Sequence, residues 1–183
     1  MVKLLSNLGH FIIFDLTKLG TAYQIINSVV DGDTIKTFEI SPLGSQAVLI
    51  LVTKDLISAQ LILNQCLSLY KSDITDAAII ENVDQNILGP YLSQNVPQIQ
   101  QAMLIAESNS FARAFSTAKK FVTSEISIVE FRVIRTGPPS LVLITTSTSI
   151  EKLNIFMQTN QNAKMTLIPE VQKSVVSLFQ VIN

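Results

Sequence analysis

Few side chains in this sequence have the type and spacing that catalysis or metal binding requires. His10 is the only histidine and Cys66 the only cysteine. One chain therefore supplies neither a histidine dyad nor a cysteine-rich metal site. We interpret His10 as a surface or strand-edge residue and Cys66 as a small core residue on the apolar side of a helix. No nucleophile–base pair or metal-ligand spacing was found, so the sequence does not predict an enzyme.

Acidic residues at two places could be mistaken for a cation site or a catalytic pair. The run Asp31-Gly32-Asp33-Thr34 lacks the further oxygen ligands and terminal glutamate of a calcium loop. It is interpreted as a turn that ends a helix, with Gly32 in the left-handed conformation. Asp15 and Glu107 follow equivalent apolar strands, 92 positions apart. We expect them at symmetric places in subunit junctions, where a carboxylate accepts backbone N–H groups.

A repeated order of elements would position these residues. In each half, a buried strand precedes an amphipathic helix, two β-runs joined by a Gly/Pro turn, a second helix, a last strand and a short terminal helix. This order, β-α-β-β-α-β-α twice, predicts an α+β fold of two ferredoxin-like domains, residues 1–93 and 94–183. The polar linker at 93–98 contains Pro97. The predicted strands are Phe11–Leu16, Ile35–Ile40, Ala47–Val52, Ala77–Val83, Ala102–Glu107, Ile126–Val133, Leu141–Thr145 and Lys164–Ile168.

Composition limits the classes of partner. Apolar residues make up 48% of the 183 residues and charged residues only 15%, which favours an oligomer because little surface is available for solvated charge. The 13 basic and 14 acidic side chains form no basic patch, so nucleic acid is not an expected partner. No apolar run is long enough to span a membrane. We expect a soluble, cytoplasmic protein that does not contact a membrane.

The second half resembles the shell domain of bacterial microcompartments. The resemblance rests on the strand Ala102–Ser108, the small-residue helix Phe111–Ala118 and the strand Ile126–Val133 leading to Gly137. The first half is similar over 14–17 and 35–45. Both halves keep the unpermuted element order, so the chain resembles the tandem, trimer-forming class of this family, and within it the PduT type. The resemblance implies a structural shell protein: a pseudohexameric homotrimer with a central pore for small polar metabolites.

The resemblance also implies roles for particular loops and partners. The pore would be lined by two hairpin loops of each chain, and the partners would be other copies, other shell proteins and the enzymes enclosed by the shell. PduT-type relatives hold an iron–sulfur cluster on a cysteine of the first pore loop, whereas this loop reads Ser41-Pro42-Leu43-Gly44-Ser45, so no cofactor is expected. The expected pore-lining residues are Leu43, Gly44, Ser45, Gln46, Thr136, Gly137 and Pro138.

Three further positions correspond to the edge at which family tiles contact one another. The edge lysine of the family is replaced by Asp31 and Thr123, and the edge arginine by Glu170. These replacements predict that the protein alone assembles only weakly into two-dimensional layers of tiles. They also predict that it enters a shell beside partner tiles whose edge side chains supply the hydrogen-bond donors.

An alternative of a different class remains open. Duplicated ferredoxin-like domains also occur in regulatory proteins, and such a protein would bind a small molecule at the interface between its domains. In that case the two hairpin loops would be ordinary turns that need Gly and Pro for backbone reasons.

Overall fold

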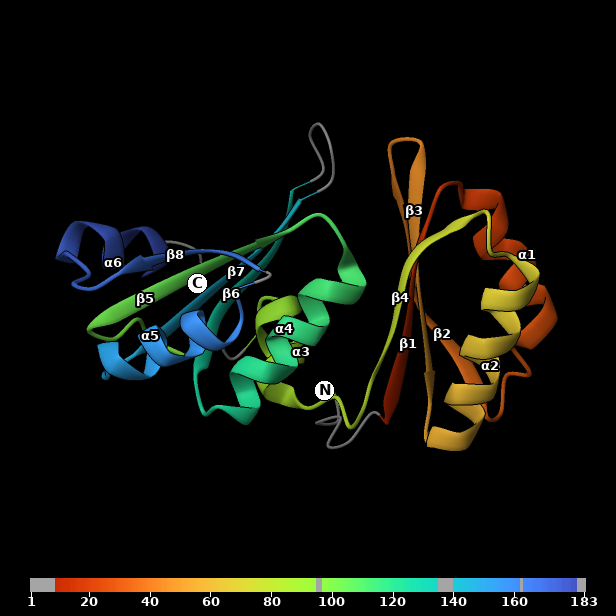
Figure 1. The fold of residues 1–183 in the computed structure, drawn as a ribbon, viewed down its shortest axis with the longest axis horizontal. Helices are drawn as coiled ribbons and strands as arrows, with labels where there is room; N and C mark the ends of the chain where they lie inside the picture. The colour runs from red at the N-terminus through yellow and green to blue at the C-terminus, as the bar shows by residue number, and fades with distance from the viewer. Residues whose placement is uncertain (1–8, 95–96, 135–139, 162, 181–183) are drawn as a thin grey trace.

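Two four-stranded antiparallel sheets form the chain, as the computed structural model in Figure 1 shows for residues 9–94, 97–134, 140–161 and 163–180. Their strand orders are β2-β3-β1-β4 and β6-β7-β5-β8. This arrangement confirms the prediction of two ferredoxin-like halves. The elements are β1 (His10–Leu16), α1 (Leu19–Val29), β2 (Ile35–Leu43), β3 (Gln46–Thr53), α2 (Leu56–Leu69), β4 (Ile74–Ile80), α3 (Gln85–Tyr91), β5 (Ala102–Ser108), α4 (Phe111–Thr123), β6 (Ser127–Ile134), β7 (Ser140–Ser147), α5 (Ile150–Thr159), β8 (Lys164–Ile168) and α6 (Lys173–Gln180).

Local sequence accounts for several element ends. Asp55 begins α2 because its carboxylate accepts the amide hydrogens of Ile57 and Ser58. The predicted strand Ala77–Val83 is wrong at both ends, since β4 covers Ile74–Ile80. Asn82 has a positive φ of 48°, which turns the chain out of the sheet. Val83 is apolar because it packs into the core beyond the end of β4, not because it lies in a strand.

The first sheet is covered on both faces (Figure 1). Ile12 and Phe14 of β1 belong to the apolar cluster that α1 and α2 cover. Phe11 and Ile13 alternate with them and belong to a second cluster, which includes residues of α4 and of the second sheet. Alternation along a strand sends successive side chains to opposite faces, so β1, which is apolar throughout 11–14, is a central strand with no solvent-facing side.

The two halves therefore share one apolar core. α4 packs against β4 and β1 of the first sheet as well as against its own sheet, and α3 packs against β6 and α4. The predicted boundary between residues 93 and 94 follows α3, so the last helix of the first half lies against the second half. No helix in the described ranges has the length and apolar character needed to cross a membrane.

Candidate assembly interface

A carboxylate of the first half caps the first long helix of the second half. Phe111 N donates to Asp15 Oδ1 at 2.9 Å, Ala112 N to Oδ2 at 3.0 Å, and Ser110 Oγ to Oδ2 at 2.9 Å. These amides are among those left without an intrahelical partner at the start of α4. Asp15 accepts backbone N–H groups as expected, but at a junction between the halves of one chain, not between subunits. Burial raises the pKa of Asp15, and the hydrogen bonds from Ala112, Phe111 and Ser110 oppose this shift.

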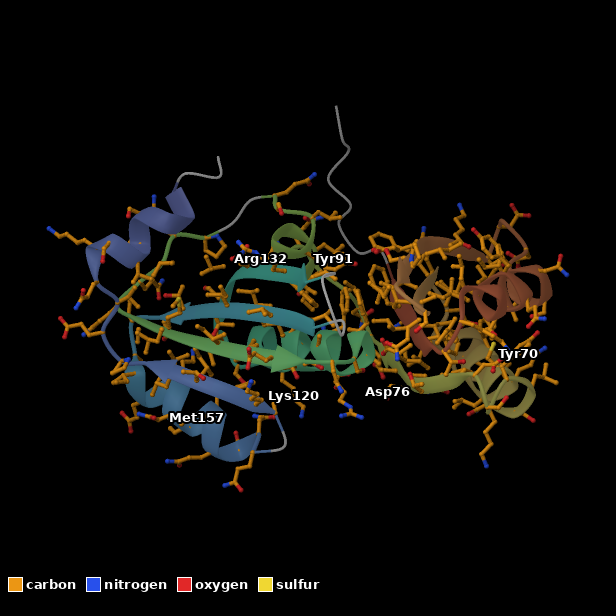
Figure 2. All side chains as sticks on the ribbon, turned by 90° about the horizontal axis from the view of Figure 1, so that it is seen from above. Tyr70, Asp76, Tyr91, Lys120, Arg132 and Met157 are labelled. Atoms are coloured by element: carbon orange, nitrogen blue, oxygen red, sulfur yellow. The ribbon has the colours of Figure 1, made fainter. Side chains whose placement is uncertain are left out.

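Charged and aromatic contacts extend the same junction. Arg113 Nε donates to Asp76 Oδ2 at 2.8 Å, and Figure 2 shows Asp76 where the two halves meet. Farther along α4, the ring of Phe115 lies 5.0 Å from that of Tyr91 and 4.8 Å from that of Phe131, measured between centroids. Phe115 is fully buried. The junction thus combines an apolar centre with a charged margin.

A partly buried carboxylate on β2, that of Glu39, also takes part in this contact. Tyr91 donates its hydroxyl hydrogen to Glu39 Oε2 at 2.6 Å, and Ser41 donates to Glu39 Oε1. Both carboxylate oxygens of Glu39 are therefore satisfied by hydroxyl groups, one of which comes from α3. Hydrogen bonds of this kind are needed because an unpaired acceptor in the interior is costly.

The exposed side of α1 is equivalent in position to the side of α4 that is buried against the first sheet. Lys18 and Ser110 occupy the N-cap positions of α1 and α4, so residues 92 positions apart are equivalent. Tyr23 is then the counterpart of Phe115, yet it is 57% exposed. Gly20, Gln24 and Asn27 on the same side of α1 are also exposed. Among the described residues, no side chain caps the N-terminus of α1, whereas Ser110 and Asp15 both cap α4.

The outer face of the second sheet is equivalent in position to the face of the first sheet against which α4 packs. Ile105, Val142 and Ile144 are equivalent to Ile13, Val48 and Ile50, because each set has the same register around β1 or β5. The three in the first sheet are fully buried, whereas those in the second are only partly buried. Glu107, the counterpart of Asp15, is exposed and forms an ion pair with Lys164. In the described part of the chain it caps no helix, unlike Asp15.

The first expected pore loop is a tight hairpin. Leu43 pairs with Gln46, so only Gly44 and Ser45 lie between the strands. Gly44 has a φ of 66°, which suits the first central residue of a type II′ turn. Gly44, Ser45 and Gln46 are exposed, and Leu43 is buried at the end of β2. Thr136, Gly137 and Pro138 lie outside the described residues, but the neighbouring ends of β6 and β7 point to the same side of the molecule as this hairpin (Figure 1).

The three expected tile-edge residues are all exposed. Asp31 Oδ1 accepts the amide hydrogens of Ile35, Thr34 and Asp33, and these bonds hold its pKa below the usual value. Gly32 has a φ of 80°, which confirms the predicted left-handed turn. Thr123 donates to backbone carbonyls of its own helix. Asp31 and Thr123 are therefore engaged locally and do not project as a lysine would.

The residues of the first hairpin do not fit an iron–sulfur cluster. Such a cluster needs thiolate ligands, and the hydroxyl of Ser41 already donates to Glu39. Cys66 belongs to α2, on the other face of the first sheet, where burial raises the pKa of its thiol to about 11. His10 is also buried, at the start of the central strand β1, where its Nδ1 accepts the amide hydrogen of Asn82 at 3.4 Å. The expectation of a surface or edge position for His10 is wrong.

A groove of about 1050 Å³ runs along α4 between the edge strands β4 and β8. Arg113, Lys120 and Lys164 line it. Each of these cations already has a partner: Asp76 for Arg113, Glu107 for Lys164, and the side-chain oxygen of Asn160 for Lys120. The groove could hold a polar small molecule, but its charges are largely balanced within the chain.

The contacts of Asp73 with the start of α1 predict a loss of stability in acid. Asp73 accepts from Thr21 at 2.8 Å and pairs with Lys18 at 3.0 Å, and the bond from Thr21 is the main cause of its lowered pKa. A lowered folded-state pKa stabilises the fold above the unfolded value of 3.8, and this stabilisation is lost as the pH falls through the folded-state value. We expect Asp73→Asn to flatten the fall in urea midpoint between about pH 5 and pH 3. An unchanged pH profile would contradict this role.

Sequence reasoning did not identify Ser110, Arg113, Asp76 or Tyr23 as interface residues. A signal was available for Tyr23, because an aromatic residue recurs at the same 92-residue offset in Phe115. Nothing in the sequence marked Asp76, whose role depends on how β4 lies beside the start of α4.

One solved structure is similar to this chain over nearly its whole length. The sequence matches no model of a protein family and no curated protein. Among solved structures, the chain is similar to a microcompartment protein from Desulfitobacterium hafniense, with a TM-score of 0.70 and 14% identity over 92% of this chain and 98% of that one. A putative glycine cleavage system transcriptional repressor is much less similar, with a TM-score of 0.32 and 12% identity over 87% of this chain and 96% of that one.

Proposed function

We propose that the chain is a structural shell protein of a bacterial microcompartment, which assembles as a homotrimer with six similar domains around a central pore. The observation that carries the proposal is the pair of unoccupied surfaces described above. The outer face of the second sheet matches the face that receives α4, and the exposed side of α1 matches the side of α4 that is received.

These two surfaces are complementary in a head-to-tail sense. α1 of one copy would lie on the second sheet of the next copy, as α4 lies on the first sheet within a chain. Repeated contacts of this kind give either a closed ring or an open filament. Closure after three copies, with two domains each, is what the resemblance to the trimer-forming tandem class implies, and the likeness in fold to a microcompartment protein supports that resemblance.

Polar groups at these surfaces favour the same arrangement. The N-terminus of α1 has amides that no side chain in the described ranges caps, and Glu107 occupies in the second sheet the position of Asp15 in the first. A carboxylate at a helix N-terminus is favoured both by hydrogen bonding and by the helix dipole. Glu107 of the next copy would therefore cap the α1 that lies on its second sheet, while Lys164 remains beside Glu107.

In such a ring the hairpins would surround the axis. The turn at Gly44 and Ser45 and the loop containing Thr136, Gly137 and Pro138 would alternate, with Gln46 beside them, whereas Leu43 would support the hairpin from inside the fold. Hydroxyl, amide and backbone groups suit small polar metabolites. The partners of the ring would be other shell proteins in the cytoplasm, because Asp31, Thr123 and Glu170 supply no edge lysine or arginine.

A regulatory protein that binds a small molecule is the second candidate, and the groove between β4, α4 and β8 is the observation that favours it. The existing ion pairs within the groove weaken this case, since a charged ligand would have to displace them. The shell proposal accounts in addition for the exposed α1 and second-sheet surfaces.

Sedimentation velocity tests the proposal. The purified chain is expected to sediment as a homotrimer at micromolar concentration, since each ring would bury three copies of an apolar interface. Coexpression with microcompartment shell proteins should then recover the chain in the assembled shells. A monomer at these concentrations, or a trimer that never enters shells, would overturn the proposed function.

A further inference from the structure

The second sheet has one buried acceptor that the chain itself does not satisfy. Glu130 Oε1 accepts from Arg132 Nε at 2.7 Å, whereas Glu130 Oε2 is buried and no group in the described part of the chain hydrogen-bonds to it. Native proteins rarely leave such an atom unpaired, because the loss of hydration is not compensated. A donor from outside the chain would remove this cost.

The position of Glu130 indicates where that donor would come from. Glu130 pairs with Ile144 on β7 as Glu39 pairs with Ile50 on β3, so the two glutamates are equivalent. The second oxygen of Glu39 receives the hydroxyl of Tyr91, whose ring packs edge-on against Phe115 of α4. In the first sheet, the hydroxyl that reaches the glutamate thus comes from Tyr91 of α3. The neighbouring ring on α4, that of Phe115, has no hydroxyl group.

On the second sheet, the helix expected to pack is α1, which carries a tyrosine where α4 carries phenylalanine. Tyr23 replaces Phe115 at this position and is 57% exposed. An exposed aromatic ring with a polar tip is suited to an interface in which the ring is buried and the hydroxyl finds an acceptor.

We infer that Tyr23 of one copy donates its hydroxyl hydrogen to Glu130 Oε2 of the next copy. This inference rests on the proposed ring and specifies one contact within it. A hydrogen bond from a neutral hydroxyl to a buried carboxylate is among the stronger kinds, so its loss should weaken association roughly tenfold at each interface. The bond also sets the register of α1 on the sheet, because only one position of the helix brings the hydroxyl to this oxygen.

A double-mutant cycle on trimer dissociation, measured by sedimentation equilibrium, tests the inference. Tyr23→Phe removes only the hydroxyl, and Glu130→Met removes the acceptor while keeping the length of the side chain. Tyr23→Phe is expected to weaken association about tenfold per interface in the wild-type background and less than about twofold in the Glu130→Met background. Tyr70→Phe, at the end of α2, serves as the control and should leave association unchanged.

The outcomes separate this contact from the ring itself. The proposed contact is wrong if the wild-type chain is a trimer but the Tyr23→Phe trimer dissociates no more readily. It is also wrong if Tyr23→Phe weakens association equally in both backgrounds. Neither result would contradict the trimer itself. A monomeric wild-type chain would overturn both. Circular dichroism of each variant verifies that the fold is intact.

Discussion

Ile105→Glu is expected to convert the proposed trimer into a folded monomer. Ile105 lies on the outer face of the second sheet, at the position where Ile13 is fully buried by α4 on the first sheet. Glutamate at this position would place a carboxylate in the apolar centre of the contact with α1 of the neighbouring copy. Burying an unpaired charge costs several kcal/mol per site, and a ring contains three such sites. Sedimentation velocity at micromolar concentration should therefore show a single species of one chain.

The same replacement elsewhere provides a matched control. Ile57 on α2 is 68% exposed and lies outside the proposed interface, so Ile57→Glu should leave the trimer intact. Ile105 is already partly exposed in a single chain, which predicts that Ile105→Glu changes the stability of the monomer little. A trimer that persists in Ile105→Glu would show that this face is not the contact.

Phe115→Ala is expected to lower the free energy of unfolding by about 3–5 kcal/mol, the usual cost of removing a fully buried aromatic ring. The ring of Phe115 lies between the halves, in contact with Phe11 of the first sheet, Tyr91 of α3 and Phe131 of the second sheet. Removal of this ring would leave a cavity in the shared core, where the first sheet, α3 and the second sheet meet. The measurement is urea unfolding followed by circular dichroism in the Ile105→Glu background, so that assembly does not contribute.

Tyr23→Ala is the comparison at the equivalent position on α1. Since Tyr23 is exposed in the single chain, its removal should change monomer stability by no more than about 0.5 kcal/mol. The expected asymmetry between two residues at equivalent positions follows directly from the packing of α4. Two separate unfolding transitions in the parent monomer would contradict a shared core, because independent halves would unfold one after the other.

Much of the fold follows from local patterns that the sequence displays. The runs at Phe11–Phe14 and Ala102–Ala106 are too apolar for a half-exposed strand, and they are the central strands of their sheets. The helical spacing of Phe111, Ala114 and Ala118 predicted the buried side of α4. The last strand of the first half was misplaced because Val83 is apolar for tertiary reasons, since it fills the core beyond the end of β4.

By itself, the sequence determined the repeated order of strands and helices, the tight turn at Gly44 and the role of Asp15 as an acceptor of backbone amides. These features depend on side-chain periodicity, on backbone conformation and on the need of a buried carboxylate for donors, all of which act over short distances or at equivalent positions of a repeat. Only the tertiary structure decided that Phe115 is buried while Tyr23 is exposed. It also decided that both carboxylate oxygens of Glu39 accept hydrogen bonds, whereas Oε2 of Glu130 accepts none from the described residues. The two halves have similar local patterns, so the difference between them arises from which surface each helix finds within the same chain.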